Sequence, residues 1–412
     1  MHRLKIFTST SRFWAPLKNT NGNSDIFDVM QTQMCRHVAS DAGEKKLFTP
    51  GPLGTSLTVK QAMLRDVGSR DVEFIKTISF IRSKLLDIAG VSANDYTTIP
   101  VQGSGTFAVE AVFQCAVPRQ NNNKVLILEN GAYGKRMGKI CETLSIPHHI
   151  ESFREDKAVD AGRVEELLKK DNSYNLVSIV HCETSSGVFN PVEEVGSIVK
   201  TTSPNSSYFV DGMSSFGAVP LDFKKANVDY LVSSANKCIQ GTPGFSFAIA
   251  KKDKLSQCKG NSRSLSLDLV DQCETLDKTG QFRFTPATHS MLAFKQALLE
   301  LEEEGGVTGR ANRYQKNRSI IKRGMKELGF KELLDDDISG YIITSFLFPD
   351  HPNFNFQQFY SRLNDKDQVI YPGKVLNTDC FRIGNIGHLF PQDMEHFLVC
   401  AKQVCQDMDL KL

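Results

Sequence analysis

A lysine, an aspartate and a glycine-bearing turn are the parts of this 412-residue sequence that could do chemistry together. Lys237 lies in the small-residue segment SSANKCIQGTPGF, which leaves little room for a flexible, hydrated side chain. Asp211 directly follows the apolar run YFV, and a carboxylate there is costly to bury unless it meets a cation or a strong hydrogen-bond donor. Each alone fits a plain structural role, a solvated lysine or a strand-end cap, but their order along the chain points to a shared site.

The turn is part of VQGSGTFAVEAVF, residues 101–113, where glycines precede an apolar helical segment. The backbone amides of Ser104, Gly105 and Thr106, with the two hydroxyl groups, would face the positive end of that helix, which suits a phosphate. No G-K-[ST] follows, so the turn is not a nucleotide P-loop, and the dinucleotide fingerprint is incomplete. A plain capping turn would show the same short pattern.

These three parts together are what a pyridoxal phosphate enzyme requires. A lysine amine forms a Schiff base with the cofactor aldehyde, an acid keeps the pyridine nitrogen protonated, and amides at a helix start hold the phosphate. Lys237 must also lose its proton near neutral pH, which a partly desolvated site beside a cationic ring favours. We therefore expect pyridoxal 5'-phosphate as the cofactor, Lys237 as its covalent anchor and proton shuttle, and Asp211 as the partner of the pyridine nitrogen.

Strands alternating with helices are expected to position these residues. Beyond Leu47, short apolar runs alternate with amphipathic stretches, which is typical of a parallel sheet in an α/β protein. Because ligands collect outside the carboxyl ends of such strands, Glu183, Asp211 and Lys237 should converge on one crevice. The expected strands are residues 125–128, 176–181, 208–211, 230–233 and 245–250.

The character of the sequence changes near residue 310, after the segment EEEGGVTG, where a helix runs into two glycines. We expect an N-terminal extension at residues 1–46, a large cofactor-binding domain at 47–310 and a smaller α+β domain at 311–412. The first 24 residues are basic, rich in Ser and Thr and free of acids, as in a transit peptide, although a disordered leader fits equally. The expected location is therefore intracellular, either the mitochondrial matrix or the cytoplasm.

Composition excludes several classes of partner. Lys and Arg number 49 against 47 Asp and Glu, a formal net charge of +2, so neither nucleic acid nor an anionic membrane is expected as a partner. No run approaches the roughly 18 to 20 apolar residues that span a bilayer. The ten cysteines lack a C-x-x-C pair, which favours reduced thiols over disulfides or a zinc site, so no metal is expected.

The chain resembles the class-V, fold-type I aminotransferases, and among them those that act on 2-aminoethylphosphonate and pyruvate. The resemblance covers essentially all of the chain after residue 46. It implies a large domain with a mainly parallel sheet flanked by helices, plus a small domain. Its motifs are LFTPGPLGTSLTVKQAML, VQGSGTFAVEA, NGAYGKRM, HCETSSGVFNP, VDGMSSFGAVPLD, SSANKCIQGTPGF, QFRFTPATHSMLAF, YPGKV and DCFRIGNIG.

The same resemblance implies roles for further residues. It places Tyr133 stacked on the cofactor ring, Thr184 near its phenolic oxygen, and Asn236 beside the phosphate-binding turn. Thr285 would reach the phosphate of the partner subunit's cofactor, which implies a homodimer with shared active sites. Arg382 would bind the substrate anion, because its planar fork can accept a carboxylate or a phosphonate in two parallel hydrogen bonds.

The implied reaction is a two-stage, ping-pong amino transfer that yields phosphonoacetaldehyde and L-alanine. Another class-V transaminase, such as an alanine–glyoxylate or serine–pyruvate enzyme, would share everything except the donor preference. A cysteine desulfurase would need a thiol on a mobile loop, and Cys238 does adjoin the lysine. A non-catalytic protein on the same fold would be free to lose the lysine, whereas every catalytic position is present here.

Overall fold

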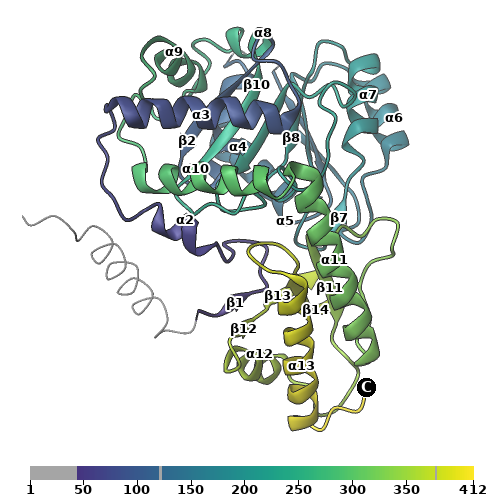
Figure 1. Cartoon of the computed structure of the whole chain (residues 1–412). Helices are drawn as coiled ribbons and strands as arrows, with labels where there is room; N and C mark the ends of the chain where they lie inside the picture. Colours follow the sequence, from purple (N-terminus) through teal and green to yellow (C-terminus); the bar gives the residue numbers. More distant parts are fainter. Residues whose placement is uncertain (1–43, 120–122, 376–377) are drawn as a thin grey trace, which may run out of the picture. The chain divides into compact units, whose positions relative to one another are not determined.

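The computed structural model describes residues 44–119, 123–375 and 378–412 (Figure 1). Residues Lys45–Leu412 form one compact unit. The extension expected at residues 1–46 lies outside the described residues except at its end, where strand β1 (Lys46–Leu47) pairs in parallel with β12 (Gln368–Val369). The end of that segment is therefore part of the fold.

A seven-stranded sheet forms the centre of the N-terminal part, in the order β2-β10-β9-β8-β5-β3-β4. Only β10 runs antiparallel to its neighbours, so the sheet is mainly parallel, as expected for this fold class. Most of its strands are buried along their whole length, which explains their continuous apolar runs. The strands are β2 (Tyr96–Gln102), β3 (Val125–Glu129), β4 (His148–Ser152), β5 (Leu176–Val180), β8 (Ser207–Asp211), β9 (Tyr230–Ser234) and β10 (Phe245–Lys251).

Helices cover both faces of this sheet and bury a separate hydrophobic cluster on each. Along β3, Leu126 and Leu128 enter one cluster while Val125 and Ile127 enter the other, which is the two-residue alternation of a strand. Helices α3 (Val72–Ala89), α6 (Ala161–Lys170), α7 (Val192–Thr202) and α10 (Thr288–Glu303) pack on the first face, and α4 (Gly105–Ala116), α5 (Ala132–Thr143), α8 (Lys252–Ser256) and α9 (Leu269–Thr279) on the second. Short elements complete this part: α2 (Leu57–Gln61), β6 (Cys182–Glu183) and β7 (Val188–Phe189).

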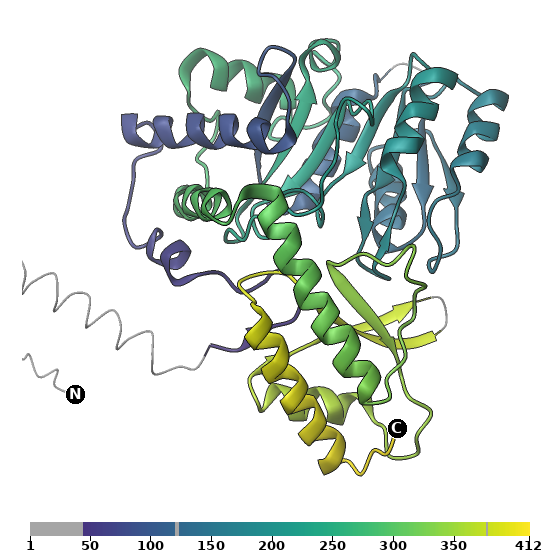
Figure 2. The same ribbon diagram turned by 45° about the vertical axis from the view of Figure 1, so that its right-hand side comes forward.

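The C-terminal part is built around a three-stranded antiparallel sheet in the order β11-β14-β13. Its core contains Phe346 and Phe381 together with Phe48 from the N-terminal segment. Figure 2 shows α11 running from the end of α10 into this part, so the expected boundary at residue 310 falls inside a helix and stays a prediction. The elements are α11 (Gly306–Glu327), β11 (Ile343–Leu347), α12 (Phe356–Asn364), β13 (Tyr371–Val375), β14 (Thr378–Gly384) and α13 (Pro391–Asp407).

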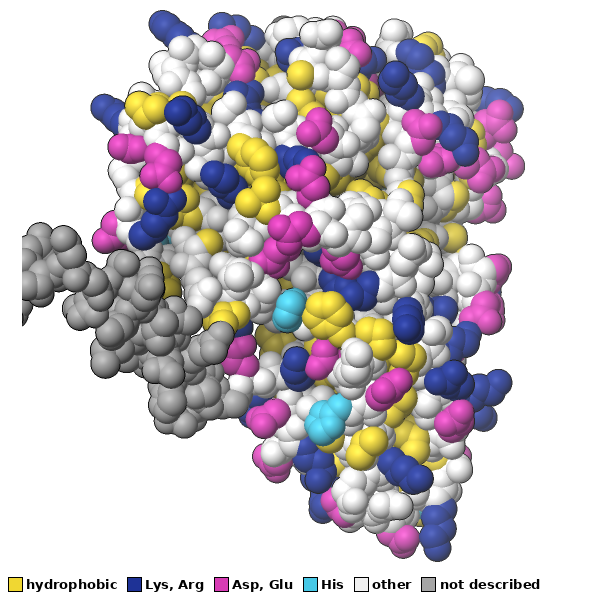
Figure 3. All heavy atoms as spheres, viewed as in Figure 1, with side chains coloured by type: hydrophobic (Ala, Val, Ile, Leu, Met, Phe, Trp, Pro, Cys, Tyr) yellow, Lys and Arg dark blue, Asp and Glu magenta, His cyan; other side chains and the backbone are white. Residues whose placement is uncertain are grey.

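The surface carries both signs of charge. On the face shown in Figure 3, basic and acidic side chains are interspersed over the described residues. None of the described helices has the length and apolar character needed to cross a membrane. The described cysteines are free and buried, and this part of the chain contains no group of His, Cys, Asp and Glu side chains that could hold a metal ion.

Candidate active site

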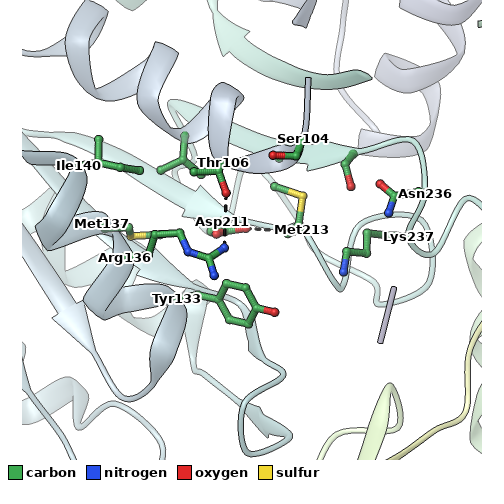
Figure 4. Close-up of a pocket in the computed structure, with 13 residues that line it drawn as sticks. Ser104, Thr106, Tyr133, Arg136, Met137, Ile140, Asp211, Met213, Asn236 and Lys237 are labelled. Atoms are coloured by element: carbon green, nitrogen blue, oxygen red, sulfur yellow. Dashed lines mark hydrogen bonds between the residues drawn. The ribbon is translucent and has the colours of Figure 1, made fainter. Parts of the chain in front are cut away.

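A cavity of about 200 Å³ opens where β8 and β9 end, between the start of α4 and the side of α5. Figure 4 shows its side chains converging from these elements. Because the carboxyl ends of parallel strands meet at one edge of the sheet, residues far apart in the sequence are brought together here. Among the expected site residues, the lining contains Ser104, Gly105, Thr106, Tyr133, Asp211, Asn236 and Lys237.

The first turn of α4 forms one wall of the cavity. Ser104 is the N-cap in an extended conformation, and its side chain makes no capping hydrogen bond. The first amides of a helix have no intrahelical partner, so this end can accept a ligand. A Cβ built on Gly105 would lie 2.0 Å from Cε of Met213, so the side chain of Met213 packs directly on the helix start.

Asp211 ends β8 with its side chain in the cavity wall, and the residue is only 4% exposed. The N–H of Met213 donates to its Oδ1 at 2.9 Å, but the carboxylate forms no ion pair with any other described residue. Burial raises the pKa of Asp211 to about 6, while the nearby positive charge of Lys237 works in the opposite direction. A buried acid in this state is suited to receive a cationic N–H.

Lys237 follows β9 in a tight turn closed by hydrogen bonds from Gln240 N to Lys237 O, 2.7 Å, and from Gly241 N to Ala235 O, 2.8 Å. Its Nζ donates to the carbonyl of Pro50 at 2.9 Å. Burial lowers the pKa of this amine. The next residue is also fixed, because the buried guanidinium of Arg310 donates to Cys238 O.

Tyr133 and Arg136 reach the cavity from the first turns of α5. The guanidinium carbon of Arg136 lies 5.0 Å from the centre of the Tyr133 ring, and its Nη1 is 3.4 Å from Oγ1 of Thr106. Figure 4 shows both side chains pointing into the same space as Asp211. Burial raises the pKa of the Tyr133 phenol.

Glu183 lies behind Tyr133 and is not part of the cavity lining. Its carboxylate accepts hydrogen bonds from the N–H of Tyr133 at 3.2 Å and from the N–H and hydroxyl of Ser185 at 3.1 and 2.6 Å. Burial raises the pKa of Glu183 to about 7, although these hydrogen bonds oppose the shift. We expected this residue at the crevice, and its contacts instead place it at the N-terminus of α5.

Thr184 and Arg382 meet at the edge of the site. The guanidinium of Arg382 donates to the carbonyls of Thr184 and Pro372, both at 2.6 Å, and lies 4.8 Å from the ring centre of Tyr371. Its Nε is buried without a hydrogen-bond partner among the described residues, and burial lowers its pKa. The hydroxyl of Thr184 is likewise buried without a hydrogen bond of good geometry to the described part of the chain.

Thr285 is exposed and does not line the cavity of its own chain. The sequence also did not identify Arg136, Met213 and the apolar wall of Val109, Met137 and Ile140. One signal was available for Arg136: it lies three residues after Tyr133 on a helix, and such residues share a face.

The model of the family described as Aminotransferase class-V matches residues 56–364. The 2-aminoethylphosphonate–pyruvate transaminase of Vibrio vulnificus is 47% identical over 357 residues, covering 86% of this chain and 96% of the relative. The enzyme of that name from Bacteroides fragilis is 46% identical over 359 residues, covering 87% of this chain and 98% of the relative.

Solved structures show the same fold at low sequence identity. Alanine–glyoxylate aminotransferase from Nostoc sp. superposes with a TM-score of 0.81 at 23% identity, covering 88% of this chain and 96% of the other. Pyridoxamine–pyruvate aminotransferase from Mesorhizobium loti superposes with a TM-score of 0.80 at 20% sequence identity, covering 90% of this chain and 95% of the other. These likenesses confirm the α/β fold of type I aminotransferases, and with the family match they show that the chain belongs to the class-V aminotransferases.

Proposed function

We propose that this protein is a pyridoxal phosphate-dependent aminotransferase that moves the amino group of 2-aminoethylphosphonate to pyruvate, giving phosphonoacetaldehyde and L-alanine. The observation that supports it most is the identity of about 47% to transaminases of that name over nearly their whole length. The cavity adds a physical reason, because it joins a buried amine, a buried acid and a free helix N-terminus.

The residues present fit pyridoxal 5'-phosphate. The start of α4 offers unpaired amides and an uncommitted Ser104 hydroxyl, which suits a phosphate. Asp211 is a buried acid without an ion pair to the described residues, which suits a place opposite a protonated ring nitrogen. The flat ring of Tyr133 can stack on an aromatic ligand. When bound, this cofactor supplies an aldehyde that accepts an amine and a ring that takes up electrons.

Lys237 is the proposed nucleophile and proton carrier. Burial lowers its pKa, so a larger share of the amine is neutral near pH 7 than for an exposed lysine. A neutral amine can attack an aldehyde and afterwards accept and return a proton. The hydrogen bond from Nζ to Pro50 O holds the amine on the cavity side until it reacts.

Ser104, Gly105, Thr106 and Asn236 are proposed to surround the phosphate, and Thr184 to approach the cofactor's phenolic oxygen. The buried hydroxyl of Thr184, which lies near the Tyr133 phenol and has no hydrogen bond of good geometry to the described residues, supports that assignment. Arg382 is proposed to bind the phosphonate of the donor and then the carboxylate of pyruvate. Its Nη atoms each donate to one carbonyl, and because a guanidinium carries five N–H donors, the unpaired Nε–H and the remaining Nη–H groups are left for a substrate anion.

A homodimer is also part of the proposal. Thr285 is exposed in the single chain, so a role in cofactor binding requires a partner subunit. The relatives named above are bacterial and give no support to a mitochondrial leader, whose residues lie outside the described part of the chain. The homodimer is tested by measuring the molecular mass of the purified protein in solution. Cleavage of a leader is tested separately, by sequencing the N-terminus of protein isolated from its native cells.

A donor screen with added pyridoxal phosphate tests the reaction. We expect turnover of 2-aminoethylphosphonate with pyruvate to exceed turnover of serine or alanine with pyruvate or glyoxylate. A preference for alanine with glyoxylate would instead indicate another class-V transaminase. Lys237→Ala should lose both the visible absorption of the bound cofactor and all turnover, so an active, coloured variant would refute the role of Lys237.

A further inference from the structure

An arginine other than Arg382 lines the cavity, and none of the roles above uses it. Arg136 is exposed at the mouth of the cavity in the isolated chain, with its guanidinium between the Tyr133 ring and the first turn of α4 (Figure 4). Its nearest polar contact is the Thr106 hydroxyl at 3.4 Å, a long hydrogen bond. Most N–H donors of the Arg136 guanidinium are therefore available for a ligand.

The charges around Arg136 distinguish it from its neighbours on α5. Lys135 pairs with Glu155 at 2.5 Å, and Lys139 pairs with Glu142 at 2.8 Å. Arg136 forms no ion pair with any described residue. The one acid in the same cavity, Asp211, is buried and bonded to Met213 N. Arg136 therefore forms no close ion pair in this part of the chain, although its positive charge acts to lower the pKa of Asp211.

The helix that carries Arg136 is fixed at its start by contacts from elsewhere in the chain. Its N-cap is Gly131, which has no side chain to cap the helix. Glu183 accepts from Tyr133 N at 3.2 Å and Ser185 Oγ accepts from Ala132 N at 3.2 Å, so the loop after β6 caps α5 instead. A Cβ at Gly131 would lie 2.4 Å from Glu183 Cγ, so this close approach requires glycine or a shift of the loop. The cap sets the direction of the helix and hence of Arg136.

We propose that Arg136 binds a tetrahedral phosphorus oxyanion in the cavity, together with the Thr106 hydroxyl and the free amides at the start of α4. A guanidinium fork is well matched to phosphate and phosphonate oxygens, and the helix start supplies donors on the opposite side. The inference depends on the proposed function, which offers two sources of this anion: the phosphate of the cofactor and the phosphonate of the donor.

The test compares Arg136→Gln and Arg136→Lys with Lys139→Gln, a control that removes one positive charge from the same helix outside the cavity. Four constants are measured: the Kd of the cofactor-free protein for inorganic phosphate, its Kd for pyridoxal phosphate, and the KM values for 2-aminoethylphosphonate and for pyruvate at saturating cofactor. Thermal unfolding of each variant shows whether the fold is intact. If Arg136→Gln does not fold, Arg136→Lys, which keeps the charge but loses the fork, carries the test.

If the anion is the cofactor phosphate, Arg136→Gln should raise the Kd for both pyridoxal phosphate and inorganic phosphate by about tenfold or more, with substrate KM values unchanged. If it is the donor phosphonate, the KM for 2-aminoethylphosphonate should rise by about tenfold, with the cofactor Kd and the pyruvate KM unchanged. Arg136→Lys should fall between wild type and Arg136→Gln, because the lysine lacks the fork.

The inference is overturned if every one of these constants in Arg136→Gln stays within about twofold of the Lys139→Gln control. A wild-type protein that takes up no pyridoxal phosphate and transaminates no donor would refute the proposed function instead. In that case the Kd for inorganic phosphate still tests the role of Arg136. Equal Kd values for wild type and Arg136→Gln would show that Arg136 does not bind the anion.

Discussion

Gly51 should be essential for activity because its missing side chain leaves space for the amine of Lys237. A Cβ built on Gly51 would lie 2.5 Å from Nζ and 2.7 Å from Cδ of that lysine. Ordinary contacts between such atoms are about 3.5 Å, so in Gly51→Ala the amine must move by about 1 Å. Displacements of about 1 Å in a catalytic group cost on the order of 100-fold in rate.

Stability should also fall, but the protein should still fold, because a lysine side chain can move aside. The φ of +131° costs a non-glycine residue about 1–3 kcal/mol, and loss of the hydrogen bond to Pro50 O costs about 0.5–1.5 kcal/mol. We therefore expect unfolding to become easier by about 1.5–4.5 kcal/mol in urea titrations. Activity is read as kcat/KM for 2-aminoethylphosphonate at saturating pyridoxal phosphate.

Gly54→Ala provides the matched control, because no atom lies within 4 Å of the position that its Cβ would take and it belongs to the same loop. It should keep kcat/KM within about twofold of wild type. If Gly51→Ala were as active as Gly54→Ala, the packing of this loop on the lysine would have no catalytic consequence.

Two further predictions concern buried charges. Burial raises the pKa of Glu183 from its ordinary 4.5 to about 7 in the folded protein. Between these two values the folded state binds this proton more tightly than the unfolded state does. The free energy of unfolding of the cofactor-free protein should therefore decrease as the pH rises from 4.5 to 7. Glu183→Gln should flatten that slope in urea titrations, and an unchanged slope would contradict the assignment. Arg310 is 2% exposed, pairs with Glu304 at 2.6 Å and donates to Cys238 O. Because Glu304 keeps its ion pair with Arg313 at 2.7 Å, Arg310→Met should destabilise by about 1–3 kcal/mol. Arg323→Met is its control, because Arg323 is exposed on the same helix and forms no ion pair with the described residues. Equal denaturation midpoints for the two variants would contradict a structural role for Arg310.

The sequence was sufficient to predict the parts of the site that follow from local pattern. Asp211 and Lys237 follow apolar strands, and Ser104 precedes an apolar helix, so their convergence follows from the topology of a parallel sheet. Tyr133 and Asn236 line the same cavity, as the resemblance implied. Roles for these residues remain predictions until variants are assayed.

Features that depend on contacts between distant segments could not be predicted in this way. Gly51 meets Lys237 and Glu183 caps α5 only after folding, and neither contact leaves a trace in local sequence. For Arg136 the only sequence signal is its spacing of three residues from Tyr133 on a helix, which does not show that it reaches the start of α4. The role proposed for Thr285 would require a second subunit, so a single chain gives no geometry for it.

The N-terminal segment also has a mechanical consequence. Phe48 accepts a hydrogen bond from Gly384 N at 2.9 Å, and Pro50, two residues later, accepts one from Lys237 Nζ. Gly384 ends the strand that carries Arg382. The backbone from Phe48 to Pro50 thus links two parts of the site: the strand that carries Arg382, which is proposed to bind the substrate anion, and the amine of Lys237. We therefore expect a displacement of that strand on anion binding to shift the amine proposed to react.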